Sequence, residues 1–92
     1  MIRRFTHRGL KRLFEKDDRK GVHAQHVARL RLILTLLNVA RDPAAMDLPG
    51  YDLHQLKGNR KGEWSVRVSG NWRVTFRFEG QDVTGVKYED YH

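Results

Sequence analysis

Two neighbouring segments that alternate apolar and polar residues constrain this fold more than any other feature. The segments flank Ser69-Gly70-Asn71, a sequence typical of a tight turn. Side chains in a β-strand point alternately to the two faces of a sheet, so each segment predicts one apolar face. The alternating apolar residues are Trp64, Val66 and Val68 before the turn, and Trp72, Val74, Phe76 and Phe78 after it. We therefore predict an antiparallel hairpin at the centre of the fold.

Helical periodicity precedes this hairpin. Apolar residues recur at helical spacing through residues 23–40 and predict an amphipathic helix. Its apolar stripe comprises Val27, Leu30, Ile33, Leu34 and Leu37. We also predict a short strand at 2–5, a brief helix at 7–14, a weak strand at 51–56 and a last strand at 83–88. Helices followed by an antiparallel meander indicate an α+β fold, with the helices covering the face that carries the tryptophans.

Length and composition indicate a single domain over residues 1–92. Apolar residues make up 39% and charged residues 32% of the chain, which argues against wholesale disorder. The chain has no cysteine, so disulfides and thiolate metal sites are excluded. No apolar run approaches the length of a membrane span, and the N-terminus does not resemble a secretory signal. We expect a cytoplasmic protein without membrane contacts.

The charge of the chain predicts a polyanionic partner. Lys and Arg number 18 against 11 acidic residues, which gives a net charge of +7. The excess lies mainly in residues 1–20 and 57–77. Nucleic acid is the natural polyanion for such a surface. The alternative is a generally basic surface without a specific partner.

Three arginines carry the strongest physical signal for binding. Arg67, Arg73 and Arg77 alternate with the apolar residues, so we expect them on the face opposite the tryptophans, within reach of a phosphate backbone. A solvated sheet face could also carry arginines, but acids usually balance them. Residues 64–78 contain no Asp or Glu, which favours the binding interpretation.

Histidines and the end of the chain supply candidates for proton transfer. His54 lies three residues before Lys57, and the chain ends in Asp90-Tyr91-His92. An imidazole can take or give a proton near neutral pH, although a lone histidine is more often a surface or packing residue. His23 and His26 could share a helical face, but no third metal ligand is evident, and we predict neither a metal nor another cofactor. No phosphate-binding glycine loop or serine-hydrolase motif is present.

These motifs together resemble the HigB-type toxins of the RelE/ParE toxin superfamily. The resemblance covers nearly the whole chain and is carried by Leu56-Lys57-Gly58-x-Arg60, Asn71-Trp72-Arg73-Val74 and the ending Asp90-Tyr91-His92. It implies the RelE-like microbial RNase fold, with a short N-terminal strand and two helices packed on a twisted antiparallel sheet.

The resemblance also implies a function. HigB-type toxins are ribosome-dependent endoribonucleases that cut translated mRNA in the A site of the 70S ribosome. A helix-turn-helix HigA-type antitoxin neutralises them, and operator DNA is bound only through the toxin–antitoxin complex. The matching positions imply catalysis by His54, Asp90, Tyr91 and His92. They also imply contacts to mRNA phosphates by basic positions such as Lys57, Arg67 and Arg73.

The residues fit metal-independent RNA cleavage, in which the 2′-oxygen attacks the adjacent phosphorus. We expect His54 or His92 to act as the base and the other as acid or orienting group. Arg73 is expected to meet the developing charge as a further catalytic residue. Four basic residues are predicted to bind RNA: Lys57, Arg60, Arg67 and Arg77. The alternatives are a non-catalytic RNA- or DNA-binding module, and a regulatory subunit that binds a protein partner.

Overall fold

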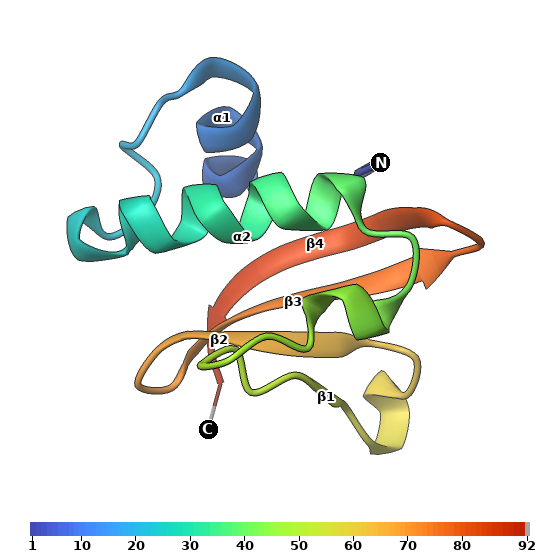
Figure 1. Ribbon diagram of the computed structural model, residues 1–92. Coiled ribbons are helices and arrows are strands. Elements are labelled where there is room, and N and C mark those ends of the chain that lie inside the picture. The colour runs from blue at the N-terminus through green and yellow to red at the C-terminus, as the bar shows by residue number, and fades with distance from the viewer. Residues whose placement is uncertain (92) are drawn as a thin grey trace.

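The computed structural model describes residues 1–91 and has two helices on one side of a four-stranded sheet (Figure 1). The α-helices are α1 (Arg8–Lys16) and α2 (Val27–Val39). The strands are β1 (His54–Gln55), β2 (Trp64–Ser69), β3 (Trp72–Glu79) and β4 (Asp82–Asp90). Short 3₁₀ turns lie at Ala24–His26, Pro43–Met46 and Gly58–Arg60. The predicted α+β class is confirmed.

The sheet is an antiparallel meander in the order β1-β2-β3-β4. Val66 pairs with Val74, and Val74 pairs with Tyr88, so the predicted hairpin forms the centre of the sheet. The pairing of β3 with β4 shifts after Thr75. Gly85 lies at this irregularity with a φ of 62°, a backbone conformation that glycine adopts without strain.

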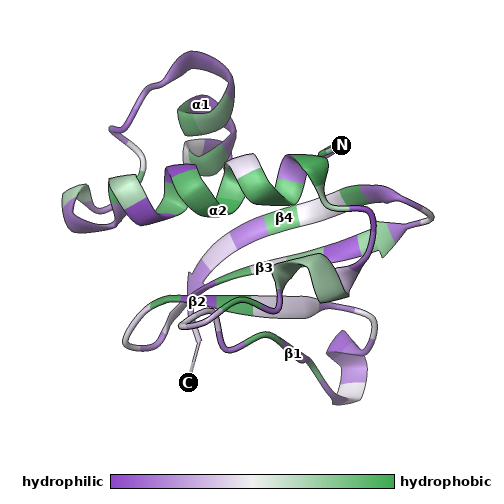
Figure 2. Ribbon diagram, in the orientation of Figure 1, coloured by the Kyte–Doolittle hydropathy of each residue, from purple (hydrophilic) through white to green (hydrophobic). Residues whose placement is uncertain are grey.

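The hydrophobic core lies between the sheet and the helices. The predicted stripe of α2 is buried in full, and it packs with the apolar face of the hairpin. In Figure 2 the hydrophobic colour dominates α2, whereas the connection between α1 and α2 is largely hydrophilic. The fully buried apolar side chains of the hairpin are Val66, Val74 and Phe76, while Trp64 and Trp72 are partly buried against the same core. The helices therefore cover the predicted face.

The N-terminal segment is less regular than the predicted strand. Ile2 and Phe5 form isolated parallel bridges to Val83 and Val86 of β4. The Arg3 N–H donates to the Val83 carbonyl oxygen at 2.7 Å, which attaches the segment to the edge of the sheet. Two bridges protect the β4 edge without a continuous ladder.

Local capping sets the helix boundaries. The His7 ring accepts a hydrogen bond from the Leu10 N–H, so α1 begins at Arg8. The long predicted helix is divided, because residues 24–26 form a 3₁₀ turn before α2. Among the described residues, no helix is long and apolar enough to cross a membrane.

Candidate active site

The sheet face opposite the helices carries most of the predicted site residues, and we call it the open face. Paired residues on neighbouring strands point to the same side of a sheet. The pairing defines two rows across this face: His54, Ser65, Thr75 and Lys87 in one, and Arg67, Arg73 and Glu89 in the next. The expected common face for Arg67 and Arg73 is therefore confirmed by register. Arg77 follows Thr75 along β3 on the same side.

Arg73 is buried at the centre of this face, with only 7% of its surface exposed, and it binds several neighbouring polar groups. Its Nε donates to Ser65 Oγ at 2.8 Å, and its Nη2 donates to the Asp52 carbonyl oxygen at 2.6 Å. Its Nη1 also lies 3.3 Å from an Asp52 carboxylate oxygen. We expected Arg73 to project toward a phosphate. Instead, its guanidinium joins the segment before β1 to the centre of the sheet.

His54 lies at the exposed edge of this arrangement. Its Nδ1 is 3.2 Å from the Asp52 carbonyl oxygen and 3.3 Å from Arg73 Nη2, while its Nε2 is 3.5 Å from Ser65 Oγ. A proton on Nδ1 can be donated to the carbonyl, and a proton on Nε2 leaves Nδ1 to accept from Arg73. Both neutral tautomers therefore have partners, and the ring is oriented without being buried.

Arg60 forms the second polar network of the open face. It binds Glu63 through contacts of 2.8 and 3.0 Å, and Glu89 through two contacts of 2.8 Å. These hydrogen bonds to Arg60 hold the pKa of both carboxyls below the ordinary value and raise the pKa of Arg60. We predicted that Arg60 binds RNA. In the structure its guanidinium binds the carboxylates of Glu63 and Glu89, and the bond to Glu89 joins the 58–60 turn to β4.

Acidic residues from outside the hairpin reduce the positive charge of the open face. We based the binding interpretation partly on the absence of acids from residues 64–78. Glu89 is nevertheless the β4 partner of Arg73, and Glu63 lies 3.6 Å from Arg77. Glu89 also lies 3.7 Å from the Lys87 ammonium. Lys57, Arg67 and Arg77 remain the exposed cations among the predicted RNA-binding residues.

The predicted terminal residues separate at the end of β4. The Tyr91 N–H donates to the Asn71 carbonyl oxygen at 2.8 Å, and its ring centre lies 5.6 Å from Arg60 Cζ, so Tyr91 accompanies the Arg60 network. Asp90 instead pairs with Trp72 and lines a pocket on the helix side of the sheet. His92, which we predicted to be catalytic, lies outside the described residues. The structure thus places His54 beside Arg73 and Tyr91 beside Arg60. Asp90 lines the pocket on the helix side of the sheet.

The helical histidine pair has a structural explanation. His26 Nδ1 lies 2.6 Å from the Tyr88 hydroxyl, and burial, followed by the neighbouring His23, lowers the pKa of His26. Within residues 1–91 there is no group of three or more side chains suited to holding a metal ion. His26 therefore acts as a buried hydrogen-bonding residue under the end of β4.

Sequence reasoning missed Asp52, Ser65 and Glu89, which position the predicted residues. Ser65 is fully buried, and a small polar residue between Trp64 and Val66 is the signal that could have identified it. Asp52 lies before β1 with a φ of 47°, which is not extended backbone, so strand spacing could not have identified it. Glu89 could be found only from the strand register, which the sequence does not fix.

The chain is similar to known toxins over its full length. The sequence model of a family described as "RelE-like toxin of type II toxin-antitoxin system HigB" matches residues 3–92. A curated relative from Proteus vulgaris, named "Endoribonuclease HigB", is 46% identical over 92 residues and covers 100% of both chains. The crystal structure of a mutant YafQ from E. coli superposes with a TM-score of 0.63, at 18% identity, covering 98% of this chain and 91% of that one. The last comparison concerns the fold alone.

Proposed function

Because this chain belongs to the RelE-like HigB toxins of type II toxin–antitoxin systems, we propose that it is an endoribonuclease that cuts translated mRNA in the ribosomal A site. The observation that carries the proposal is His54, an exposed imidazole whose two nitrogens are both supported by polar neighbours on a basic sheet face. The relative named as an endoribonuclease supports the same reaction. The family assignment implies that an antitoxin is its partner.

The chemistry follows from RNA itself, which carries its own nucleophile. In the proposed reaction the 2′-oxygen attacks the adjacent phosphorus, and the bond from phosphorus to the 5′-oxygen breaks. One group removes the 2′-proton and another protonates the leaving 5′-oxygen, which yields a 2′,3′-cyclic phosphate and a free 5′-hydroxyl. No metal is required for these steps.

His54 is the described residue best suited to one of these proton transfers. With a proton held on Nδ1 by the Asp52 carbonyl, its Nε2 carries the lone pair that a general base needs. With the opposite tautomer, Arg73 supports Nδ1 and Nε2 carries the proton. We assign the second proton transfer to the end of the chain, where Tyr91 lies beside Arg60 and His92 follows.

Cations complete the proposed site in two different ways. Arg73 is buried and contacts His54, so its positive charge acts on the phosphate from within the sheet, through the imidazole. Lys57, Arg67 and Arg77 are exposed and suited to binding the flanking phosphates. We thus propose that Arg73 stabilises the reacting group while the exposed cations hold the RNA in register.

The proposed partners follow from the same assignment. We propose that a helix-turn-helix antitoxin of the HigA type neutralises this toxin in the cytoplasm, and that operator DNA is bound only by the toxin–antitoxin complex. The excess of 18 basic over 11 acidic residues favours an antitoxin whose contacting surface is acidic.

The experiment that tests this function adds the purified protein to a cell-free translation reaction and maps new mRNA ends. We expect cuts within translated codons, and no cuts in the same mRNA when ribosomes are omitted. Cuts that occur equally without ribosomes would leave an endoribonuclease but overturn the A-site proposal. Binding of mRNA without new ends would favour the non-catalytic binding module instead.

A further inference from the structure

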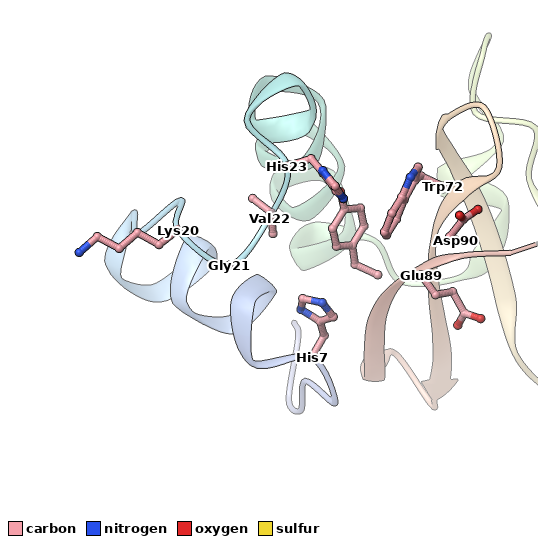
Figure 3. Close-up of a pocket in the computed structure, with 9 residues that line it drawn as sticks. His7, Lys20, Gly21, Val22, His23, Trp72, Glu89 and Asp90 are labelled. Carbon is pink, nitrogen blue, oxygen red and sulfur yellow. The ribbon is translucent and has the colours of Figure 1, made fainter.

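A pocket lies next to the end of β4, mainly on the helix side of the sheet. Its volume is about 460 Å³, within the range of small-molecule sites. Its lining includes the rings of His7, His23, Trp72 and Tyr88 and the carboxylates of Glu89 and Asp90. Figure 3 shows His7, His23 and Trp72 around the opening, while the Lys20 side chain extends away from it.

The pocket walls are mostly rings. His23 and Trp72 have centroids 4.7 Å apart at an interplanar angle of 63°, and Trp72 and Tyr88 are 4.6 Å apart at 32°. His7 meets Tyr88 edge to face at 5.4 Å. Clustered rings with exposed edges and faces are the surfaces on which nucleic-acid bases stack.

A hydrogen bond keeps the His7 imidazole uncharged. The Leu10 N–H donates to His7 Nδ1 at 3.1 Å, which requires a lone pair on that nitrogen. Burial lowers the pKa of His7 and of His26, which supports Tyr88 from below. The His7 wall and the two carboxylates of the lining therefore suit an uncharged ring better than a phosphate.

The loop that carries His23 is held in place before any ligand binds. Gly21 packs directly on Gly9 of α1, and a Cβ on Gly21 would lie 2.6 Å from Gly9 Cα. A Cβ on Gly9 would lie 2.4 Å from the Gly21 carbonyl oxygen. Neither position has room for a side chain, so the two backbones fix one wall of the pocket against the other.

The pocket lies beside Tyr91, one of the residues proposed to act in RNA cleavage. Asp90 lines the pocket, and the next residue, Tyr91, lies beside Arg60 on the open-face side. An RNA strand that crosses the end of β4 therefore passes from Tyr91 to the pocket. A flanking nucleotide can turn its base into the rings while its phosphate stays in solvent.

We propose that this pocket is a base-binding site, in which an unpaired RNA base next to the cleaved bond stacks on the exposed ring of His23, beside Trp72. This inference rests on the proposed ribonuclease function and adds a second contact surface to it. Stacking on rings tolerates every base, so the pocket contributes affinity and register rather than strict sequence preference.

Nuclear magnetic resonance of the full chain tests the proposal with a 2′-O-methyl hexaribonucleotide, which cannot be cleaved. We expect shifts at the open-face amides, at the Gly21, Val22 and His23 amides, and at the Trp72 indole N–H. A series of hexamers with one abasic residue, moved through each position, should include one that loses the pocket shifts and keeps the open-face shifts.

Variants of His23 complete the test. His23→Ala should weaken binding of the intact hexamer about fivefold or more, the effect of one lost stacking contact, and should leave binding of that abasic hexamer unchanged. His23→Phe should restore binding. Gln25→Ala, an exposed neutral change two residues away that does not line the pocket, should have no effect.

Two results would overturn the proposal in distinguishable ways. Pocket shifts that persist with every abasic hexamer, or a His23→Ala effect equal for intact and abasic RNA, would eliminate base binding alone. An RNA that shifts neither the pocket nor the open face would overturn the base-binding site, while the mapping of mRNA ends on ribosomes tests the ribonuclease function separately.

Discussion

Arg60 binds both carboxylate oxygens of Glu89, each at 2.8 Å, and so joins the 58–60 turn to the strand that leads to the end of the chain. The same guanidinium binds Glu63, which lies in the segment between that turn and β2. The side chains are only 26% exposed for Arg60 and 21% for Glu89, so solvent screens the pair weakly.

We expect Arg60→Ala to lower the free energy of unfolding by about 2 to 3 kcal/mol, because two carboxylates lose their charged hydrogen-bond partner. Arg60→Lys should recover less than half of this loss, since an ammonium cannot bind two carboxylates in the bidentate manner. Urea denaturation measures both variants. Arg3→Ala, which breaks an exposed pair with Asp82, is the control and should change stability much less. Equal losses for Arg60→Ala and Arg3→Ala would contradict this account.

The stability of the fold should fall on mild acidification. Burial lowers the pKa of His26 and His7 below the ordinary value of 6.5, so the unfolded chain binds more protons than the folded protein just below that pH. Stability from these groups is complete above pH 6.5 and is lost as the pH falls toward their folded pKa. Melting temperatures measured between pH 7.5 and 5.5 should therefore decrease.

The variant His26→Gln isolates one of the two histidines. It should be less stable than the wild type at pH 7.5, because its bond to Tyr88 is altered, and its melting temperature should depend less on pH. An unchanged slope between pH 7.5 and 5.5 would show that His26 does not contribute to the pH dependence.

The pattern of apolar residues predicted much of this fold, because the need to bury one apolar face determines how each element is oriented. The central hairpin, the stripe of α2 and the turn at Gly70 follow from apolar spacing that only one arrangement can bury. The N-terminal strand was overpredicted because edge bridges at Ile2 and Phe5 depend on β4, not on local sequence. The turn at Ala24–His26 was missed because His26 turns inward to Tyr88, a contact 62 residues away in sequence.

The site was predicted less completely than the fold, and for a related reason. Alternation correctly placed Arg67 and Arg73 on one face, but it cannot tell whether an arginine is free or paired. Asp52 and Glu89 lie in other segments, and only the folded chain brings them to Arg73 and Arg60. Alternation also places Asp90 on the side of the sheet opposite Glu89. Asp90 and Tyr91 are adjacent in the sequence, and we therefore grouped them in one site, although their side chains lie on different sides.

The exposed and buried arginines should behave differently in RNA binding. Arg67→Ala and Arg77→Ala should each weaken binding and reduce its salt slope by about 0.7 to 0.9, the value for one lost phosphate contact. Folding should be nearly unaffected, since both side chains are exposed. Affinity measured at several salt concentrations tests this, and an unchanged slope in both variants would remove them from the RNA-binding surface.

Arg73→Ala should show the opposite pattern. It removes a buried guanidinium that holds Ser65 and Asp52, so we expect a clear loss of stability in addition to slower cleavage. Its salt slope should change less than that of Arg67→Ala. A large slope change with full stability would mean that Arg73 contacts RNA directly.

Cleavage should continue in the presence of a chelator that removes free divalent ions without dissociating the ribosomes, because the proposed steps use only side chains and the 2′-oxygen. The products should carry a 2′,3′-cyclic or 3′-phosphate and a free 5′-hydroxyl. End-group analysis of the cut mRNA distinguishes this outcome from 5′-phosphate ends, which would indicate a different mechanism.

The central claim is that His54 transfers a proton during cleavage, and the most direct measurement is the single-turnover rate of mRNA cleavage on translating ribosomes for His54→Ala and the wild type. The neighbouring exposed variant Gln55→Ala serves as the control. We predict that His54→Ala lowers the rate by about 10²- to 10⁴-fold while ribosome binding and the melting temperature stay close to wild type. A rate within a few-fold of wild type, in a folded and ribosome-bound variant, would contradict the account.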